Sequence, residues 1–431
     1  MLRRVLLIAA LALPAVPAVA ATPSSVLHRA ALTADQVVGL TDERLVGVSW
    51  TAGSPTVSVR WHSTQGWSGW EVADQDSAPQ GLPGTEPLWR PAGADRVELR
   101  TTGAARGLRL LTVADTVKHT LGGARAQAAT GRDVLGQVHS RAEWGADESQ
   151  RRGKPEYAPR VNAVIVHHTV NANGYGANDV PSLIRADYAY HVQGRGWDDL
   201  GYNLLVDQFG RVWEGRYGGL GRATVGSHAG GFNDGTLGVA MIGDMTKTTA
   251  SPLAEKALAR VIGYAARTWG FEPTGSVTLT SKGSPRYAAG QRVTFPRVIG
   301  HQQTGRTACP GSVQDRLPAL RSLAVVALRA APVITSVALS GAPVHAPSAM
   351  SVDARLSLAA GWTATLTDPT GAVVAAGKGT TAAPTVSWDG QSGGLPAAPG
   401  TYRWVVTADD GFHPAVQKVG TFEVGLPLLP V

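Results

Sequence analysis

The chain has little of three things: cysteine, charge and long apolar stretches. Its single cysteine, Cys309, has no second cysteine to pair with, which excludes a disulfide-stabilised scaffold. Charged residues make up 16% of the 431 residues and hydrophobic residues 43%, a balance typical of a folded globular protein. Beyond the N-terminal segment no apolar run reaches the length that a membrane-spanning helix needs.

Basic residues are in modest excess, with a formal net charge of +7. They are spread along the sequence and form no run, so nucleic-acid binding is disfavoured. Attraction to anionic cell-wall polymers fits this balance, and so does an ordinary solvated surface.

The N-terminus has the pattern of an export signal. Arg3 and Arg4 precede an apolar run over residues 5–19 that ends in small residues up to Ala20, which predicts a cleavable signal peptide over residues 1–20. A membrane anchor is the alternative, but the run is short for a spanning helix and two prolines interrupt it. Secretion is therefore expected, and the general secretory and twin-arginine routes both stay open.

Residues 26–115 show short alternating strands separated by turns rich in glycine and proline, which predicts an N-terminal all-β sandwich domain. Its tryptophans form either a platform for sugars or the core of the sandwich, and the core is the favoured interpretation for most of them. Residues 116–134 are small, polar and aperiodic, as in a linker. The tryptophans concerned are Trp61, Trp67, Trp70 and Trp89.

Residues 332–426 form a second β-rich block with strong turn signals. The combination of Trp388-Asp389-Gly390 with a Pro-Gly-Thr-Tyr stretch ending at Tyr402 resembles the immunoglobulin-like sandwich of the flagellar hook-capping type. The resemblance implies a spacer or docking module without chemistry of its own.

The middle block, residues 137–330, mixes strand and helix patterns and predicts an α/β domain with a mixed central sheet. A helix from residue 251 to Trp269 starts with Ser251-Pro252 and ends at Gly270. The other expected elements are a buried strand at 161–167, a helix at 179–193, a hairpin of 200–206 with 211–214, and a strand at 236–242.

Histidines gather in this α/β block, and two of them follow its buried strand. His167 and His168 stand at the carboxyl end of that strand, where alternation allows only one of them to face a given site. His301 follows another β-prone run, and the loop after it returns Cys309 to its side. Two imidazoles and one thiolate suit an open tetrahedral zinc site. From spacing alone, a core histidine and a buried apolar cysteine are equally acceptable interpretations.

Seven stretches in this block resemble, in order, the peptidoglycan recognition protein family, the type 2 zinc-dependent N-acetylmuramoyl-L-alanine amidases. Together they cover most of residues 138–323, and the flanking β blocks lie outside the resemblance. The stretches are residues 139–146, 164–169, 196–203, 212–216, 226–228, 238–243 and 300–311.

The resemblance implies one zinc ion per chain, bound by His167, His301 and Cys309. It further implies that Tyr202 and Thr307 act in catalysis by hydrogen-bonding the attacking water or the developing oxyanion. Non-enzymatic family members lose the cysteine or the first histidine, and this chain keeps both.

The family's substrate groove passes His228 and Asn233, and His168 and Tyr188 are expected to line it. Trp144 and Trp197 are expected to be core residues instead.

Two features of this region stay open. Glu214 is either an assisting base or a surface carboxylate paired with Arg216. Residues 216–224 depart from the family's shorter segment, which leaves the choice between diaminopimelate and lysine stem peptides undecided.

The function implied by the resemblance is hydrolysis of the amide between N-acetylmuramic acid and L-alanine of the stem peptide. The protein is expected to be a secreted, wall-associated monomer whose partner is peptidoglycan. A protein that only binds peptidoglycan, a wall adhesin and a zinc peptidase are the alternatives, although the chain lacks a His-Glu-x-x-His motif.

Overall fold

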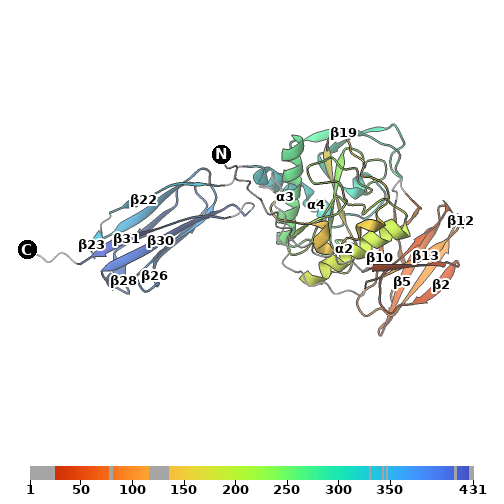
Figure 1. Ribbon diagram of the computed structural model, residues 1–431, viewed down its shortest axis with the longest axis horizontal. Coiled ribbons are helices and arrows are strands. Elements are labelled where there is room, and N and C mark those ends of the chain that lie inside the picture. Colours follow the sequence, from red (N-terminus) through yellow and green to blue (C-terminus); the bar gives the residue numbers. More distant parts are fainter. Residues whose placement is uncertain are drawn as a thin grey trace, which may run out of the picture.

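The structure is a computed structural model that describes residues 25–76, 81–115, 135–329, 332–341, 344–345, 348–411 and 415–426. The expected signal peptide and the expected linker lie outside the described residues. Figure 1 shows three successive parts, with the C-terminal strands at one end, an α/β part in the middle and the N-terminal strands at the other end. In the described part of the chain, no helix has the length and apolar character to cross a bilayer.

The N-terminal β unit, residues 25–115, consists of two antiparallel sheets facing each other across an apolar core. Val46 and Val48 from one sheet meet Val57, Val97 and Leu99 from the other, and all five are fully buried. The first sheet contains β1 (Ser25–Ala31), β3 (Glu43–Ser49), β8 (Gln75–Asp76), β9 (Gly84–Thr85), β10 (Leu88–Trp89) and β13 (Arg109–Asp115). The second contains β2 (Asp35–Gly39), β5 (Thr56–Ser63), β6 (Gly66–Trp67), β7 (Glu71–Val72) and β11 (Arg96–Thr102), and β4 (Ala52–Gly53) pairs with β12 (Ala105–Arg106).

The central α/β unit, residues 135–329, has a mixed sheet in the order β14-β17-β16-β18-β15-β21, which confirms the predicted class for this part. β15 pairs in parallel with both β18 and β21, whereas β16 and β17 form the expected antiparallel hairpin. All six residues of β15 are buried. Val164 and Val166 pack against the helices over residues 252–269 and 313–327, whereas Ala163 and Ile165 pack against Phe232 and a separate β-hairpin. The strands are β14 (Val138–His139), β15 (Ala163–His168), β16 (Leu204–Val206), β17 (Val212–Glu214), β18 (Thr236–Met241) and β21 (Val298–Gly300), with a separate hairpin of β19 (Ser276–Thr280) and β20 (Arg292–Pro296).

The helix α3 (Pro252–Trp269) has the predicted ends. The Ser251 hydroxyl caps it by accepting the Ala254 N–H, and Gly270 closes it with φ 65°, a left-handed conformation that suits glycine. The helix α4 (Val313–Ala327), which packs beside α3, was not predicted, since Pro318 lies inside it. The other α-helices of the described residues are α1 (Arg141–Trp144) and α2 (Val180–Ala189), and α2 continues as a π-helical turn over Tyr190–Gly194.

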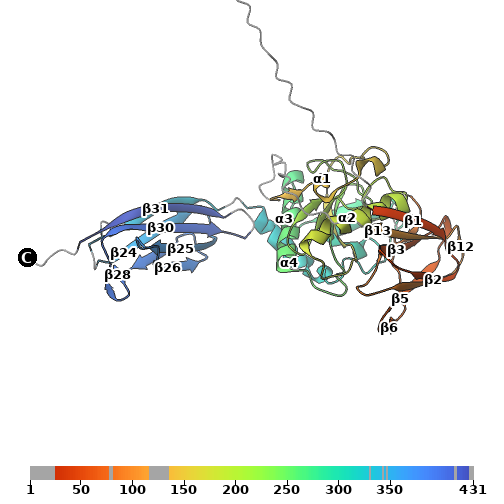
Figure 2. The same cartoon turned by 60° about the horizontal axis from the view of Figure 1, so that its bottom comes forward.

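The N-terminal β unit lies directly on the central unit. Leu45 and Leu111 of its first sheet share one buried cluster with Ile184 and Tyr190 of the α2 segment, and Figure 2 shows β1 and β13 beside α2. The Tyr190 hydroxyl donates to the Thr85 carbonyl at 2.8 Å. The two units therefore share a core and have a fixed relative position.

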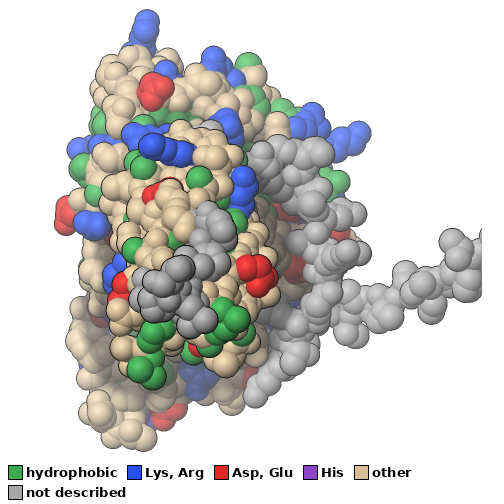
Figure 3. All heavy atoms as spheres, turned by 90° about the vertical axis from the view of Figure 1, so that its left-hand side faces the viewer, with side chains coloured by type: hydrophobic (Ala, Val, Ile, Leu, Met, Phe, Trp, Pro, Cys, Tyr) green, Lys and Arg blue, Asp and Glu red, His purple; other side chains and the backbone are tan. Residues whose placement is uncertain are grey.

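The C-terminal β unit, residues 332–426, has its own core, in which the rings of Trp388 and Tyr402 pack with their centroids 5.1 Å apart. Figure 3, which views the molecule from this end, shows basic, acidic and apolar side chains interspersed. The hook-capping resemblance stays a prediction. One sheet contains β22 (Ile334–Ser340), β24 (Met350–Leu356) and β27 (Thr385–Trp388), the other contains β23 (Val344–His345), β25 (Gly361–Thr367), β26 (Val373–Gly379), β30 (Gly400–Asp409) and β31 (Val416–Gly425), and β28 (Gln391–Ser392) pairs with β29 (Leu395–Pro396).

Candidate metal centre

Strand register brings His167 and His301 together. In the parallel pair β15 and β21, Val166 is opposite Gly300, so the residue after each stands at the same edge of the sheet. His301 begins the 3-10 turn His301–Gln303 that follows β21. The ring centroids of the two histidines are 4.5 Å apart. The side chains thus meet where the parallel strands end.

The loop after His301 returns Cys309 to this pair. Its thiol lies 3.7 Å from Nδ1 of His167 and accepts the His168 backbone N–H at 3.3 Å. The backbone closes the loop, since the Gln302 N–H donates to the Cys309 carbonyl at 2.7 Å. The potential ligand atoms of His167, His301 and Cys309 all lie within 4.8 Å of one another, and all three residues are buried.

The donor set fits zinc. Burial lowers the pKa of His167 and lowers that of His301 to about 4, so both imidazoles are neutral and able to ligate. Burial raises the pKa of the Cys309 thiol, and the nearby carboxylates of Glu86 and Asp74 add to this rise. A thiolate in this place therefore needs a cation, and two nitrogens with one sulfur leave a fourth tetrahedral position open.

The same pKa values predict how the metal-free protein responds to acid. Burial lowers the pKa of His228 to about 3, alongside the value of about 4 for His301. The unfolded chain takes up these protons near pH 6.5, whereas the folded chain resists them. The free energy of unfolding is therefore expected to fall by a few kcal/mol as the pH drops from about 6.5 to 4. Unfolding temperatures measured across this interval test the expectation, and a constant value would contradict it.

His228 lies behind His167 and not at an open surface. Its Nδ1 is 3.0 Å from Nε2 of His167, so the pair shares a proton, with direction set by the tautomer. The ring fits here because Gly238 has no side chain: a Cβ there would lie 2.3 Å from Cγ of His228. Asn233 holds the segment, its Oδ1 accepting the N–H groups of His228 and Ala229 at 2.8 Å each. This arrangement leaves Nδ1 of His167 facing Cys309 and fixes the orientation of the ring.

Tyr202 also lies at the cluster. Its ring centroid is 5.4 Å from that of His167, and the side chain is buried. The next residue, Asn203, fixes the backbone because its Oδ1 accepts the Gly238 N–H at 2.8 Å. Tyr202 therefore remains near the place where a metal-bound substrate would react.

Two expected groove residues are not brought to the cluster. His168 points to the other side of the strand, and its Nδ1 accepts the Met245 N–H at 3.0 Å. Tyr188 is buried edge-on against Trp144, and its hydroxyl donates to the Asp147 carbonyl at 3.0 Å. His168 faces away from the cluster because successive strand residues point to opposite sides. Tyr188 does so because it lies on the face of α2 that packs against Trp144.

The expected core role of Trp144 and Trp197 is confirmed, because both are buried. Trp197 stacks on His191 with centroids 4.3 Å apart and planes 8° from parallel. The Trp144 indole donates to the Glu214 carbonyl at 2.7 Å.

The guanidinium of Arg216 donates to the Leu200 carbonyl at 3.0 Å.

One residue near the cluster was missed by sequence reasoning. Asp74 of the N-terminal β unit accepts the Thr307 hydroxyl at 2.7 Å and the Ala308 N–H at 3.2 Å. Asp74 is 233 positions from Thr307 and outside the family resemblance, so no local pattern could have indicated it.

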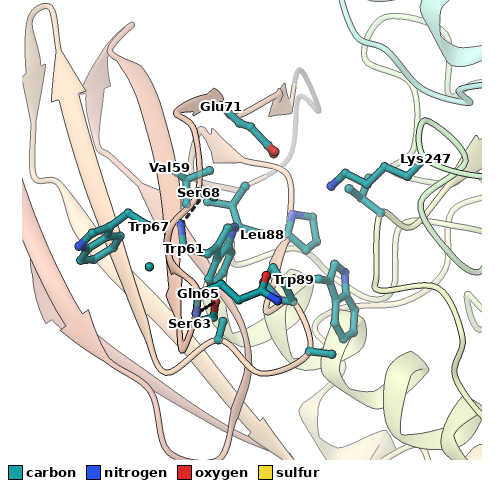
Figure 4. Close-up of a pocket in the computed structure, with 16 residues that line it drawn as sticks. Val59, Trp61, Ser63, Gln65, Trp67, Ser68, Glu71, Leu88, Trp89 and Lys247 are labelled. Atoms are coloured by element: carbon teal, nitrogen blue, oxygen red, sulfur yellow. Dashed lines mark hydrogen bonds between the residues drawn. The ribbon is translucent and has the colours of Figure 1, made fainter.

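The tryptophans of the N-terminal β unit have different roles. Trp89 is 8% exposed, but it packs in the core shared with the central unit and not, as predicted, in the core of the sandwich, whereas Trp67 is 36% exposed. The guanidinium of Arg60 lies 4.8 Å from the Trp67 ring and 4.7 Å from the Trp70 ring. A pocket of about 370 Å³ lies beside these rings. Figure 4 shows Trp61 among its lining side chains and Lys247 of the central unit extending towards it.

Comparisons with known proteins concern the central unit. Residues 157–312 match a family model described as N-acetylmuramoyl-L-alanine amidase. A peptidoglycan-recognition protein of Drosophila melanogaster is 31% identical over 178 residues, which are 41% of this chain and 83% of that protein. An N-acetylmuramoyl-L-alanine amidase of Sus scrofa is 30% identical over 185 residues, 40% of this chain and 25% of that protein. A solved structure of peptidoglycan recognition protein-LE in complex with tracheal cytotoxin has 24% identity and a TM-score of 0.34, covering 42% of this chain and 92% of that chain.

Proposed function

The chain belongs to the peptidoglycan-recognition protein family, and on that premise we propose that it is a zinc-dependent N-acetylmuramoyl-L-alanine amidase. It would hydrolyse the amide between the lactyl group of N-acetylmuramic acid and L-alanine of the stem peptide. The observation that carries the proposal is the complete donor set: His167, His301 and Cys309 converge within 4.8 Å with Tyr202 beside them.

Each residue contributes a separate function to this chemistry. Zinc, when bound, supplies a Lewis acid for the scissile carbonyl and acidifies a water molecule. His228 keeps the His167 ring oriented through the 3.0 Å contact between their nitrogens. The Tyr202 hydroxyl is the group that we assign to hydrogen-bonding the water or the oxyanion.

We assign Thr307 to holding the cysteine-bearing loop, in place of the catalytic contact that the resemblance implied. A hydroxyl has one proton, and that of Thr307 is donated to Asp74, while its oxygen accepts the Cys309 N–H at 3.1 Å. In this geometry no proton of the Thr307 hydroxyl is left for an oxyanion. Thr307 instead holds the cysteine-bearing loop.

A protein that only binds peptidoglycan is the second candidate function, since it would use the same groove. The position of the thiol argues for the hydrolase, because Cys309 faces Nδ1 of His167 at 3.7 Å and completes the three-donor cluster. A zinc peptidase and an adhesin lack a supporting observation of this kind. We further propose that the protein is a secreted, wall-associated monomer and that the C-terminal β unit is a spacer or docking module.

The test is the chemistry of the products from purified peptidoglycan. The zinc-loaded protein is expected to release stem peptides and to expose new L-alanine amino termini, measured by amino-terminal labelling and mass spectrometry. New termini from another residue would indicate a peptidase. Tight binding of peptidoglycan without any new terminus would identify the binding protein instead.

A further inference from the structure

The N-terminal β unit reaches the cysteine-bearing loop through one side chain. Both hydrogen bonds across this contact end on the same carboxylate oxygen, Oδ2 of Asp74, at 2.7 Å from the Thr307 hydroxyl and 3.2 Å from the Ala308 nitrogen. The three residues Thr307, Ala308 and Cys309 are consecutive. The Asp74 carboxylate therefore holds the two residues, Thr307 and Ala308, that directly precede Cys309.

The contact continues to Cys309 itself. The Thr307 oxygen accepts the Cys309 N–H at 3.1 Å, while the same hydroxyl donates its proton to Asp74. A hydrogen bond to an ionised carboxylate is about twice as strong as a neutral one. This bond therefore fixes the Thr307 rotamer in which its oxygen faces the Cys309 backbone.

Asp74 is itself held by the sheet framework. The Glu86 N–H donates to its carbonyl at 2.8 Å, and the preceding Ala73 is buried, with its N–H donating to the Val57 carbonyl at 2.8 Å. Behind this segment, the first sheet shares a core with α2. The Asp74 carboxylate therefore belongs to a unit whose position relative to the central unit, and to the Cys309 loop, is fixed.

We propose that the N-terminal β unit contributes to the metal centre through Asp74, a positioning residue that fixes the Cys309 loop through Thr307. This deepens the proposed function and rests on its metal site. Groups that orient metal ligands in this way typically change metal affinity by roughly 10- to 100-fold. The unit would then be required for tight zinc binding as well as for packing.

A double-mutant cycle on the full mature chain tests the proposal, with the zinc dissociation constant measured by chelator competition. Asp74→Ala and Thr307→Val are each expected to weaken zinc binding by roughly tenfold. The double variant is expected to lose less zinc affinity than the product of the two single effects, because Asp74 acts partly through the Thr307 hydroxyl and only its bond to the Ala308 N–H is independent of it. Multiplying effects, or an unchanged dissociation constant in Asp74→Ala, would overturn the proposal.

Two further variants keep the test decisive. Asp74→Asn retains an oxygen for both hydrogen bonds but loses the charge, so a smaller loss of zinc affinity is expected. This loss should be reduced further in the Thr307→Val background, where only the bond from the Ala308 N–H remains. If Asp74→Ala does not fold, the cycle of Asp74→Asn with Thr307→Val is sufficient to test the proposal. Asp35→Asn is the control, since that carboxylate is 63% exposed in β2 of the second sheet, beside Arg100, and zinc affinity should not change.

The zinc measurement separates this inference from the proposed function. If the protein hydrolyses no peptidoglycan but the cycle shows the expected coupling, the amidase assignment fails and the role of Asp74 stands. If hydrolysis is found but Asp74→Ala binds zinc as tightly as the unaltered protein, the inference fails alone. If Asp74→Ala increases hydrolysis without changing zinc affinity, the Asp74 contact is inhibitory. That result would also overturn the proposal.

Discussion

Replacing Cys309 with serine is expected to abolish tight zinc binding and amidase activity together. Among the residues that the structure describes, the cluster offers three potential donors, all within 4.8 Å of one another, and the Cys309 sulfur is one of them. Serine is nearly isosteric, but its hydroxyl is a much poorer ligand for zinc at neutral pH. Loss of the metal's contribution is expected to lower kcat/KM by at least about a thousandfold, or roughly 4 kcal/mol.

The fold of the Cys309→Ser variant should be preserved, and this can be checked by the unfolding temperature of the metal-free protein. Arg306→Ala is the matched control, because that side chain lies in the same loop but is exposed. It should keep both zinc affinity and activity. Full hydrolysis by Cys309→Ser after chelation would contradict the assignment of the ligand.

Replacing Tyr202 with phenylalanine is expected to separate catalysis from metal binding. The ring that packs 5.4 Å from His167 is retained, so zinc affinity should be unchanged. Loss of one hydrogen-bond donor to a developing oxyanion typically lowers kcat by about 100- to 1,000-fold. The expected signature is therefore a fall in kcat with one zinc ion still bound.

Tyr175→Phe is the control for loss of a tyrosine hydroxyl. That hydroxyl donates to the Ile242 carbonyl at 2.9 Å and accepts the Gln208 N–H at 2.9 Å. Its removal should cost about 1–3 kcal/mol of stability and leave kcat unchanged. Equal kcat values for Tyr202→Phe and the unaltered protein would remove Tyr202 from the chemistry.

The sequence was most informative where one rule determined the structure. The unbroken apolar run before His167 predicted a strand buried on both faces, and Ser251-Pro252 with Gly270 predicted both ends of α3. The helix α4 was not predicted, because Pro318 interrupts its helical sequence pattern. Its apolar face nevertheless packs into the core that α3 also joins. Tertiary packing can thus sustain a helix that local signals do not favour.

The metal cluster was predictable in part. Alternation along β15 implied that His167 and His168 face opposite ways, and the family resemblance selected His167. The register of β15 with β21 supplies the physical reason, because it places His167 beside His301. Tyr188 was expected in the groove, and its burial depends on how α2 rotates against Trp144. Asp74 could not be predicted, because the contact depends on the docking of two units far apart in sequence.

The most direct test of the account measures zinc content and stem-peptide release in the same samples. Protein stripped of metal and then titrated with zinc is expected to release L-alanine-terminated peptides in proportion to bound zinc, and to reach its maximum at one ion per chain. Undiminished release from metal-free protein would contradict the metal centre. Stoichiometric zinc binding without release of such peptides from any peptidoglycan would contradict the amidase function.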